Sequence, residues 1–219
     1  MHQAVRAEWP HTVIKGCNFH LGQAVQRWIA TNDRQQDYHQ DAEFRLCIRS
    51  LLALAYIPPG DVPMAFSRIE DVAPERALLV LDYFKRTYIG VTRPNGEPVH
   101  ARFPVATWNH WDSLEEGSPR TNNSLEGYHH SFASLLDNPH PNIFALVDRI
   151  KAEQEATTAF ILQLRAGAPN RRKRRKYVEL DTRLRRLRDR YEDEDTLRYL
   201  HSASYYVALR SDEPASARD

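Results

Sequence analysis

Apolar residues recur three and four positions apart along most of the chain, the spacing of a buried helix face. The clearest run is residues 41–57, where Phe44, Ile48 and Leu51 share one face before Pro58-Pro59-Gly60 ends the helix. The same spacing predicts further helices over residues 2–9, 21–30, 61–69, 74–88, 123–136, 142–165 and 177–200.

Little of the pattern is typical of strands. Thr12, Val13 and Ile14 are β-branched and predict a short strand that ends at Gly16. The polar residues 31–40 predict a loop, and the glycine- and proline-rich residues 89–107 predict a loop with a short hairpin around Asn95-Gly96. The expected fold is therefore mainly α.

Net charge, cysteine content and the length of apolar runs exclude only a few classes of protein. The chain has 219 residues and a net charge of +1, so attraction to nucleic acid has to come from local clusters of charge. Two cysteines, Cys17 and Cys47, make no disulfide framework and are typical of a reducing compartment. No apolar run reaches the length of a membrane span, so no membrane is expected and the predicted location is cytoplasm or nucleus.

Cys17 and His20 stand directly after the predicted strand, in the segment Gly-Cys-Asn-Phe-His. A thiolate and an imidazole at this spacing reach one metal ion, but a structural zinc site needs four ligands. Zinc bound by Cys17 and His20 is one interpretation. The other is that Cys17 packs in the core and His20 makes a local hydrogen bond.

Glu126 and His130 lie four residues apart on the predicted helix after Asn122 and Asn123, with His129 beside them. A carboxylate next to histidines binds a divalent metal or acts in acid–base chemistry. A glutamate in the first turn of a helix also complements the helix dipole. The residues by themselves leave both roles open.

Two further features point toward nucleic acid. The run Arg171-Arg172-Lys173-Arg174-Arg175-Lys176 is typical of phosphate binding or a nuclear import signal, and equally of a solvated linker. The indoles of Trp108 and Trp111 either stack on an unpaired base or anchor the core.

Several spaced motifs occur in a fixed order over residues 3–155: GCNFHLGQAVQRW, LALAYIPP, YFKRTYIG, WN, RTNNSLEGYHHSF and NPHPNIFALVDRIKAEQ. In this order they closely resemble the transposase domain of Mutator-like elements (MULEs). The resemblance implies an RNase H-like enzyme in which two aspartates and a glutamate hold two divalent ions, Mg²⁺ or Mn²⁺, that cut and join DNA. Glu126 occupies the position of that glutamate, and Cys17 and His20 occupy the family's Cys-x-x-His signature.

The resemblance also predicts how the chain is organised. Residues 1–20 correspond to a helix–strand remnant of the RNase H-like α/β core, 21–107 to an all-α insertion, and 108–166 to the Glu126 helix and the long helix after it. Residues 167–219 comprise the basic linker, an arginine-rich helix and a tail whose composition predicts disorder. The resemblance further implies that the intact enzyme binds DNA at transposon ends, associates with itself and is located in the nucleus.

The two aspartates of the triad have no counterpart, because the chain begins inside the helix that follows the second of them. Asp33, Asp37 and Asp41 come after the Cys-x-x-His segment and cannot replace them. One carboxylate cannot position two ions about 4 Å apart, so the chain alone is expected to be catalytically incomplete. The alternative is a domesticated, non-catalytic helical module that binds DNA or protein.

Overall fold

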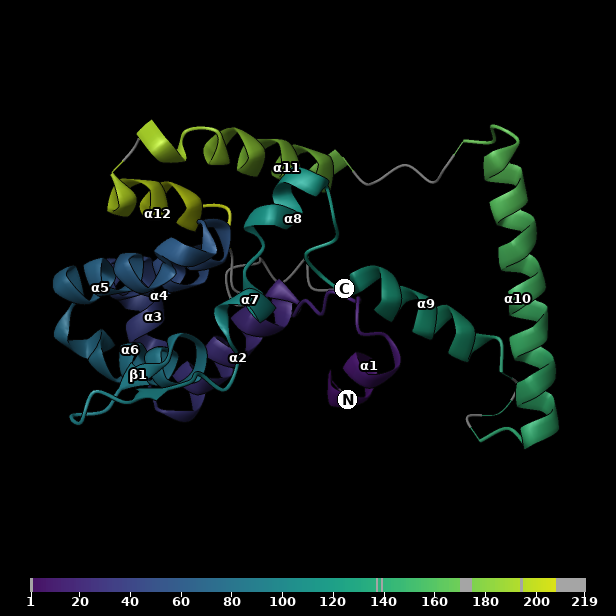
Figure 1. The fold of residues 1–219 in the computed structure, drawn as a ribbon, viewed down its shortest axis with the longest axis horizontal. Helices are drawn as coiled ribbons and strands as arrows, with labels where there is room; N and C mark the ends of the chain where they lie inside the picture. The colour runs from purple at the N-terminus through teal and green to yellow at the C-terminus, as the bar shows by residue number, and fades with distance from the viewer. Residues whose placement is uncertain (1, 137, 139, 170–174, 194, 208–219) are drawn as a thin grey trace. The chain divides into compact units, whose positions relative to one another are not determined.

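The computed structural model describes residues 2–136, 138, 140–169, 175–193 and 195–207. It is mainly helical, which confirms the fold class expected from the apolar spacing (Figure 1). The α-helices are α1 His2–Glu8, α2 Asn18–Thr31, α3 Gln35–Gln40, α4 Ala42–Ala53, α5 Val62–Val72, α6 Leu78–Phe84, α7 Val105–Trp108, α8 Trp111–Glu116, α9 Asn123–Ser134, α10 Ile143–Arg165, α11 Arg175–Arg188 and α12 Thr196–Ser204.

Short 3-10 or π turns connect several of these helices. They are η1 Leu54–Tyr56, η2 Pro59–Asp61, η3 Glu75–Ala77, η4 Lys85–Ile89 and η5 Tyr191–Asp193. The strands of the described residues, β1 Val91–Thr92 and β2 Pro98–Val99, form one antiparallel hairpin in which Val91 pairs with Val99. This hairpin surrounds Asn95-Gly96, where the turn signal predicts it.

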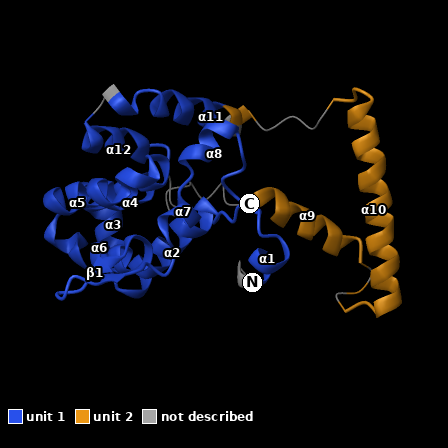
Figure 2. Cartoon of the chain, in the orientation of Figure 1, with its two compact units in different colours: residues 1–121, 179–219 blue, residues 122–178 orange. Residues whose placement is uncertain are grey.

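The chain divides into two compact units, shown in Figure 2. The first contains residues 1–121 and 179–219, and the second contains residues 122–178. The predicted segments 108–166 and 167–219 are thus each split between the units, because residues 108–121 and the C-terminal helices pack with the helical insertion.

Helix α4 is the centre of the first unit. Its buried side chains include Phe44, Ile48 and Leu51, which are inaccessible to solvent. Asp41 caps the helix by accepting hydrogen bonds from the backbone N–H groups of Glu43 and Phe44. Helices α3, α5 and α12 pack around α4, so its apolar residues form the core of the unit.

Three local predictions differ from the structure. Residues 12–15 have no regular secondary structure, because no neighbouring strand of the described residues offers them a ladder of hydrogen bonds. The expected loop 31–40 contains helix α3, which is held by the buried ring of Tyr38. The expected helix 177–200 is interrupted, and Asp195 caps the new helix α12 by accepting from the N–H groups of Leu197 and Arg198.

The two C-terminal helices belong to the core of the first unit. Leu184 and Leu187 of α11 are buried, as are Tyr199 and Leu200 of α12. Across 143 residues of sequence, the Tyr199 hydroxyl donates a 2.8 Å hydrogen bond to the carbonyl of Tyr56.

The second unit contains α9 and α10, and none of its described residues is buried. Asn142 caps α10, since its side-chain oxygen accepts a 2.9 Å hydrogen bond from the N–H of Ala145. Large apolar side chains such as Phe144 and Ile150 remain exposed. Within the described part of the chain, no helix combines the length and apolar character that crossing a membrane requires.

Candidate functional site

Glu126 lies in the first turn of α9, which begins at Asn123 after the N-cap residue Asn122. Its backbone N–H donates to the carbonyl of Asn122 over 2.9 Å. The side chains of Glu126, His129 and His130 are all exposed. Glu126 and His130, four positions apart, share one side of the helix, as the sequence predicts.

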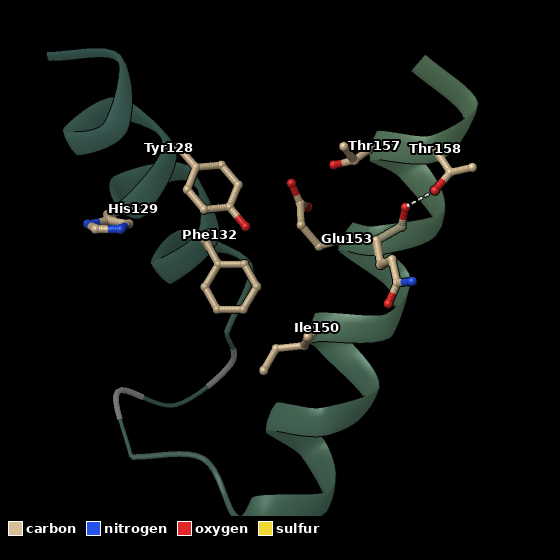
Figure 3. A pocket seen from close by; sticks show the side chains of 8 residues that line it. Tyr128, His129, Phe132, Ile150, Glu153, Thr157 and Thr158 are labelled. Carbon is tan, nitrogen blue, oxygen red and sulfur yellow. Dashed lines mark hydrogen bonds between the residues drawn. The ribbon is translucent and has the colours of Figure 1, made fainter. Parts of the chain in front are cut away.

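A neighbouring side of α9, which includes His129, lines a groove of about 480 Å³ within the second unit (Figure 3). Tyr128 and Phe132 stack with their ring centres 6.1 Å apart and point toward α10, which contributes Ile150 and Glu153. Glu126 does not line this groove. Of the site residues predicted on α9, His129 therefore lines the groove and Glu126 does not.

A metal centre needs several ligands that converge on one point. Among the described residues, no three histidine, cysteine, aspartate or glutamate side chains are placed to hold one ion. The described residues therefore do not by themselves fit a two-metal centre.

Cys17 and His20 both lie at the start of α2, where Cys17 is the N-cap residue. Cys17 is half-buried and His20 is exposed, with the rings of Phe19 and His20 edge to face at 5.6 Å. Cys47 is buried in the core, which raises the pKa of its thiol to about 12, and among the described residues it forms no three-ligand group with Cys17 and His20. Zinc at Cys17 and His20 stays a prediction that requires two more ligands.

The segment around Cys17 meets the segment that leads into α9. The backbone N–H of Asn18 donates to the carbonyl of Arg120 over 2.9 Å. The Arg120 guanidinium lies 5.8 Å from the ring centre of Tyr56 and pairs with the carboxylate of Asp181. Burial raises the pKa of Tyr56, and side-chain hydrogen bonds from Arg120 and Asn18 oppose that rise.

A second pair of contacts extends this junction. The N–H of Gly16 donates to the carbonyl of Thr107 over 2.5 Å, and a Cβ at Gly16 would lie 3.2 Å from that oxygen. The Lys15 ammonium donates to the carbonyl of Asn109 over 3.2 Å. Residues 15–18 therefore run along residues 107–120, and a glycine permits their close approach.

His110 is buried within this junction at 1% exposure. Burial, together with the positive charges of Lys15 and Arg120, lowers the pKa of its imidazole to about 4. Neither ring nitrogen has a hydrogen-bond partner among the described residues. His110 is consequently a neutral polar group inside the core at neutral pH.

Trp108 is a core residue in this structure. Only 4% of it is exposed, and its indole N–H donates to the carbonyls of Tyr88 and Phe103. The expectation that Trp108 stacks on a base is inconsistent with this burial, because its ring presents no open face. Trp111 is half-buried, and the guanidinium of Arg188 lies 4.6 Å from its ring centre.

Most of the basic run 171–176 lies outside the residues that the structure describes. Arg171, Arg172, Lys173 and Arg174 are outside the described residues, as is the side chain of Lys176. Arg175 opens α11 and is exposed. The role of the run in binding phosphates stays a prediction.

The structure thus joins residues that the motif analysis did not single out: Lys15, Tyr56, His110 and Arg120. Their position next to the motifs could have indicated them in the sequence. Lys15 precedes Gly-Cys-Asn-Phe-His, His110 follows Trp-Asn, and Arg120 is the first residue of Arg-Thr-Asn-Asn. No family model, no curated protein and no solved structure matches the chain.

Proposed function

We propose that the chain is the C-terminal portion of a Mutator-like transposase domain, a remnant of an RNase H-like fold whose parent family cuts and joins DNA. Glu126 is the third carboxylate of the parent triad. The ordered motifs on both sides of a helical insertion suggest this origin, and the observation that carries it is the contact between Asn18 and Arg120.

An insertion has to leave and re-enter its host domain at neighbouring points. Asn18 and Arg120 belong to the two motifs that flank the insertion, Gly-Cys-Asn-Phe-His and Arg-Thr-Asn-Asn. Their backbones are hydrogen-bonded although about a hundred residues separate them. The regular secondary structure of the described residues between them is helical apart from one short hairpin, as the proposal requires.

The chain alone is proposed to be catalytically incomplete. Mg²⁺ keeps several waters and needs more anchors than one carboxylate supplies. In a plasmid-nicking assay with Mg²⁺ or Mn²⁺, we expect no nicked product from the unmodified chain. Nicking that disappears in Glu126→Gln, and persists in the exposed control Glu155→Gln, would contradict this conclusion.

The origin is tested separately by the genomic DNA directly upstream of the Met1 codon. The proposal predicts an open reading frame there that encodes the remaining sheet strands and the two missing aspartates. A chain extended by that frame should nick DNA, with Glu126→Gln reducing the rate by at least about 10³-fold, as expected for loss of a group that organises the transition state. An unrelated promoter or a stop codon in its place would instead favour domestication.

DNA at transposon ends, a nuclear location and self-association of the intact enzyme belong to the same proposal. Its electrostatic part rests on the run 171–176, whose cations would displace counterions from phosphates. Neutralising the run should make the dependence of DNA affinity on salt less steep. If the salt dependence of DNA affinity is unchanged, residues 171–176 do not bind the phosphates.

A non-catalytic module that binds DNA or protein is the second candidate. The observation that favours it is the set of exposed apolar side chains of α10, such as Phe144, which is 80% exposed. Surfaces of this kind are typical of protein contacts. In this case DNA or protein binding would occur without any dependence on Glu126.

A further inference from the structure

Helices α9 and α10 of the second unit leave their apolar side chains uncovered. The two helices face each other across the groove of the candidate site, and every described residue of the unit stays at least partly exposed (Figures 2 and 3). Uncovered apolar side chains favour association, because burying them removes apolar surface from water. The second unit therefore presents a surface that a partner can cover.

Helix α10 carries its apolar residues in a heptad repeat, which is typical of a helix that packs lengthwise against another helix. The steps alternate between four and three residues along one seam, which consists of Ile143, Val147, Ile150, Gln154, Thr157, Ile161 and Leu164. The seam is open, since Ile150 is 50% exposed and Ile161 is 43% exposed. Beside it, Tyr128 and Phe132 of α9 form the other wall of the groove (Figure 3).

The seam of α10 is self-complementary. From either end of the stretch 147–164, two apolar seam residues come first and a polar one follows. When two copies of α10 run antiparallel about a two-fold axis at the middle of this stretch, the residues at equal height are Val147 and Leu164, Ile150 and Ile161, and Gln154 and Thr157. Apolar residues then meet apolar residues, and the amide and the hydroxyl in the middle can hydrogen-bond to each other.

We infer that the second unit is a dimerisation module, in which two copies of the chain join α10 to α10 in antiparallel orientation along this seam. With α9 of each copy on the flank, the product is a four-helix bundle. The inference rests on the pattern of α10 and not on the proposed function. It goes beyond the self-association expected of an intact enzyme, because it names the surface and the register and requires no DNA.

The size of the surface is sufficient for a dimer. At 1.5 Å per residue and about 10 Å of width for each helix, α10 covers about 350 Å² and α9 about 180 Å². Two copies together therefore bury about 1,000 Å², the area above which an interface supports a specific complex.

The charge of α10 favours a second copy over other partners. Three acidic and three basic residues are interspersed along the helix, so its net charge is zero. Helices that bind membrane surfaces or nucleic acid are instead rich in lysine and arginine. In the antiparallel register Lys151 lies level with Phe160, and Glu153 lies level with Thr158, so no like charges oppose each other.

The first test is analytical ultracentrifugation of the full chain from ~1 to ~100 µM, the range in which an interface at the lower size limit dissociates. We expect a monomer–dimer equilibrium. Ile150→Glu/Ile161→Glu should raise the dissociation constant at least about 100-fold, because the dimer would bury four carboxylates in its seam. The matched control is Phe144→Glu/Leu162→Glu, which adds the same charge at exposed apolar positions of α10 outside the paired seam and should change the constant less than about threefold. Equal circular dichroism of both variants excludes a loss of helix.

The second test fixes the register without adding charge. In a Cys17→Ser background under mild oxidation, Ile150→Cys mixed with Ile161→Cys should form a disulfide between the two variants. Neither variant should form one with itself, because like positions lie about 16 Å apart along the axis. A disulfide spans no more than about 7 Å between Cα atoms.

Three results would overturn the inference. The first is a monomer over the whole concentration range, including one whose seam instead binds phosphatidylcholine vesicles or a labelled DNA duplex. The second is a dimer that both glutamate variants weaken equally or that neither weakens. The third is a disulfide of Ile150→Cys with itself, which would show parallel helices. None of these results decides the transposase origin, which the upstream reading frame tests.

Discussion

Replacing Asn109 should cost more stability than any other single polar substitution considered for this chain. The side chain is fully buried, and its amide nitrogen donates to the carbonyls of Leu54 over 3.2 Å and Ile57 over 2.8 Å. Its oxygen accepts a 3.0 Å hydrogen bond from the N–H of Trp111. Asn109 thereby connects the end of η1 to the start of α8.

Asn109→Ala leaves two carbonyls and one N–H without this partner in the core. Each unsatisfied buried group costs about 1–3 kcal/mol, and partial relaxation reduces the sum. We therefore expect the free energy of unfolding to fall by about 3–5 kcal/mol. Asn109→Asp keeps the shape and the acceptor, but turns a carboxylate oxygen toward the two carbonyls.

The aspartate variant adds a distinctive dependence on pH. Burial and the nearby carbonyl oxygens should raise the pKa of the new carboxyl in the folded state, because both disfavour its charged form. The unfolded chain then loses its proton first as pH rises, so the variant should become less stable from about pH 4 upward. This direction distinguishes a lost donor from a simple cavity.

The assay is urea unfolding followed by circular dichroism and tryptophan fluorescence. Asn95→Ala is the matched control, since the Asn95 oxygen accepts a 3.2 Å hydrogen bond from the N–H of Glu97 in an exposed turn. Its loss should cost no more than about 1 kcal/mol. A loss below about 1 kcal/mol in Asn109→Ala would refute the reasoning, because it would show that the three hydrogen bonds contribute nothing net.

The remaining predictions concern the same unit. Because burial keeps His110 neutral, with a pKa of about 4, the unfolded state takes up its proton first and stability should fall as pH drops from about 6.5 to 4. Between pH 7 and 4.5 the free energy of unfolding should fall by about 2–3 kcal/mol on account of His110. Urea titrations of the unmodified chain and of His110→Gln at both pH values measure this, and the variant should lack the loss. An equal pH dependence in both proteins would show that the imidazole does not titrate in this way. Gly117 ends α8 at φ +69°, where a Cβ would lie 2.9 Å from a guanidinium nitrogen of Arg185. Gly117→Ala should cost about 1–2 kcal/mol by thermal unfolding, while Gly60→Ala, with no neighbour within 4 Å, should cost clearly less; equal losses would exclude the backbone explanation.

Local sequence signals were sufficient where one face of a helix is strongly apolar. The repeat of Phe44, Ile48 and Leu51 predicts α4, and Pro58-Pro59-Gly60 predicts its end. Helix α3 was missed because its packing depends on one ring, that of Tyr38, within an otherwise polar segment. The predicted strand 12–15 failed for the complementary reason, since strands depend on partners elsewhere in the chain.

In the candidate site, too, the sequence predicts local helix positions but not the contacts between distant segments. The helical placement of Glu126 and His130 follows from their spacing, and the structure agrees with it. The junction of Asn18 with Arg120 and the burial of Trp108 could not be read from spacing, because both depend on which segments meet in the folded chain.

The packing of α12 on α4 has a consequence for the synthesis of the protein. Tyr199 binds the carbonyl of Tyr56 from 143 residues further along the chain. At about 5–20 residues per second, a ribosome needs roughly 10–30 s to make the intervening segment. During that interval the side of α4 that α12 will cover stays exposed to solvent, so the nascent chain presents an apolar surface that chaperones can bind until α12 emerges.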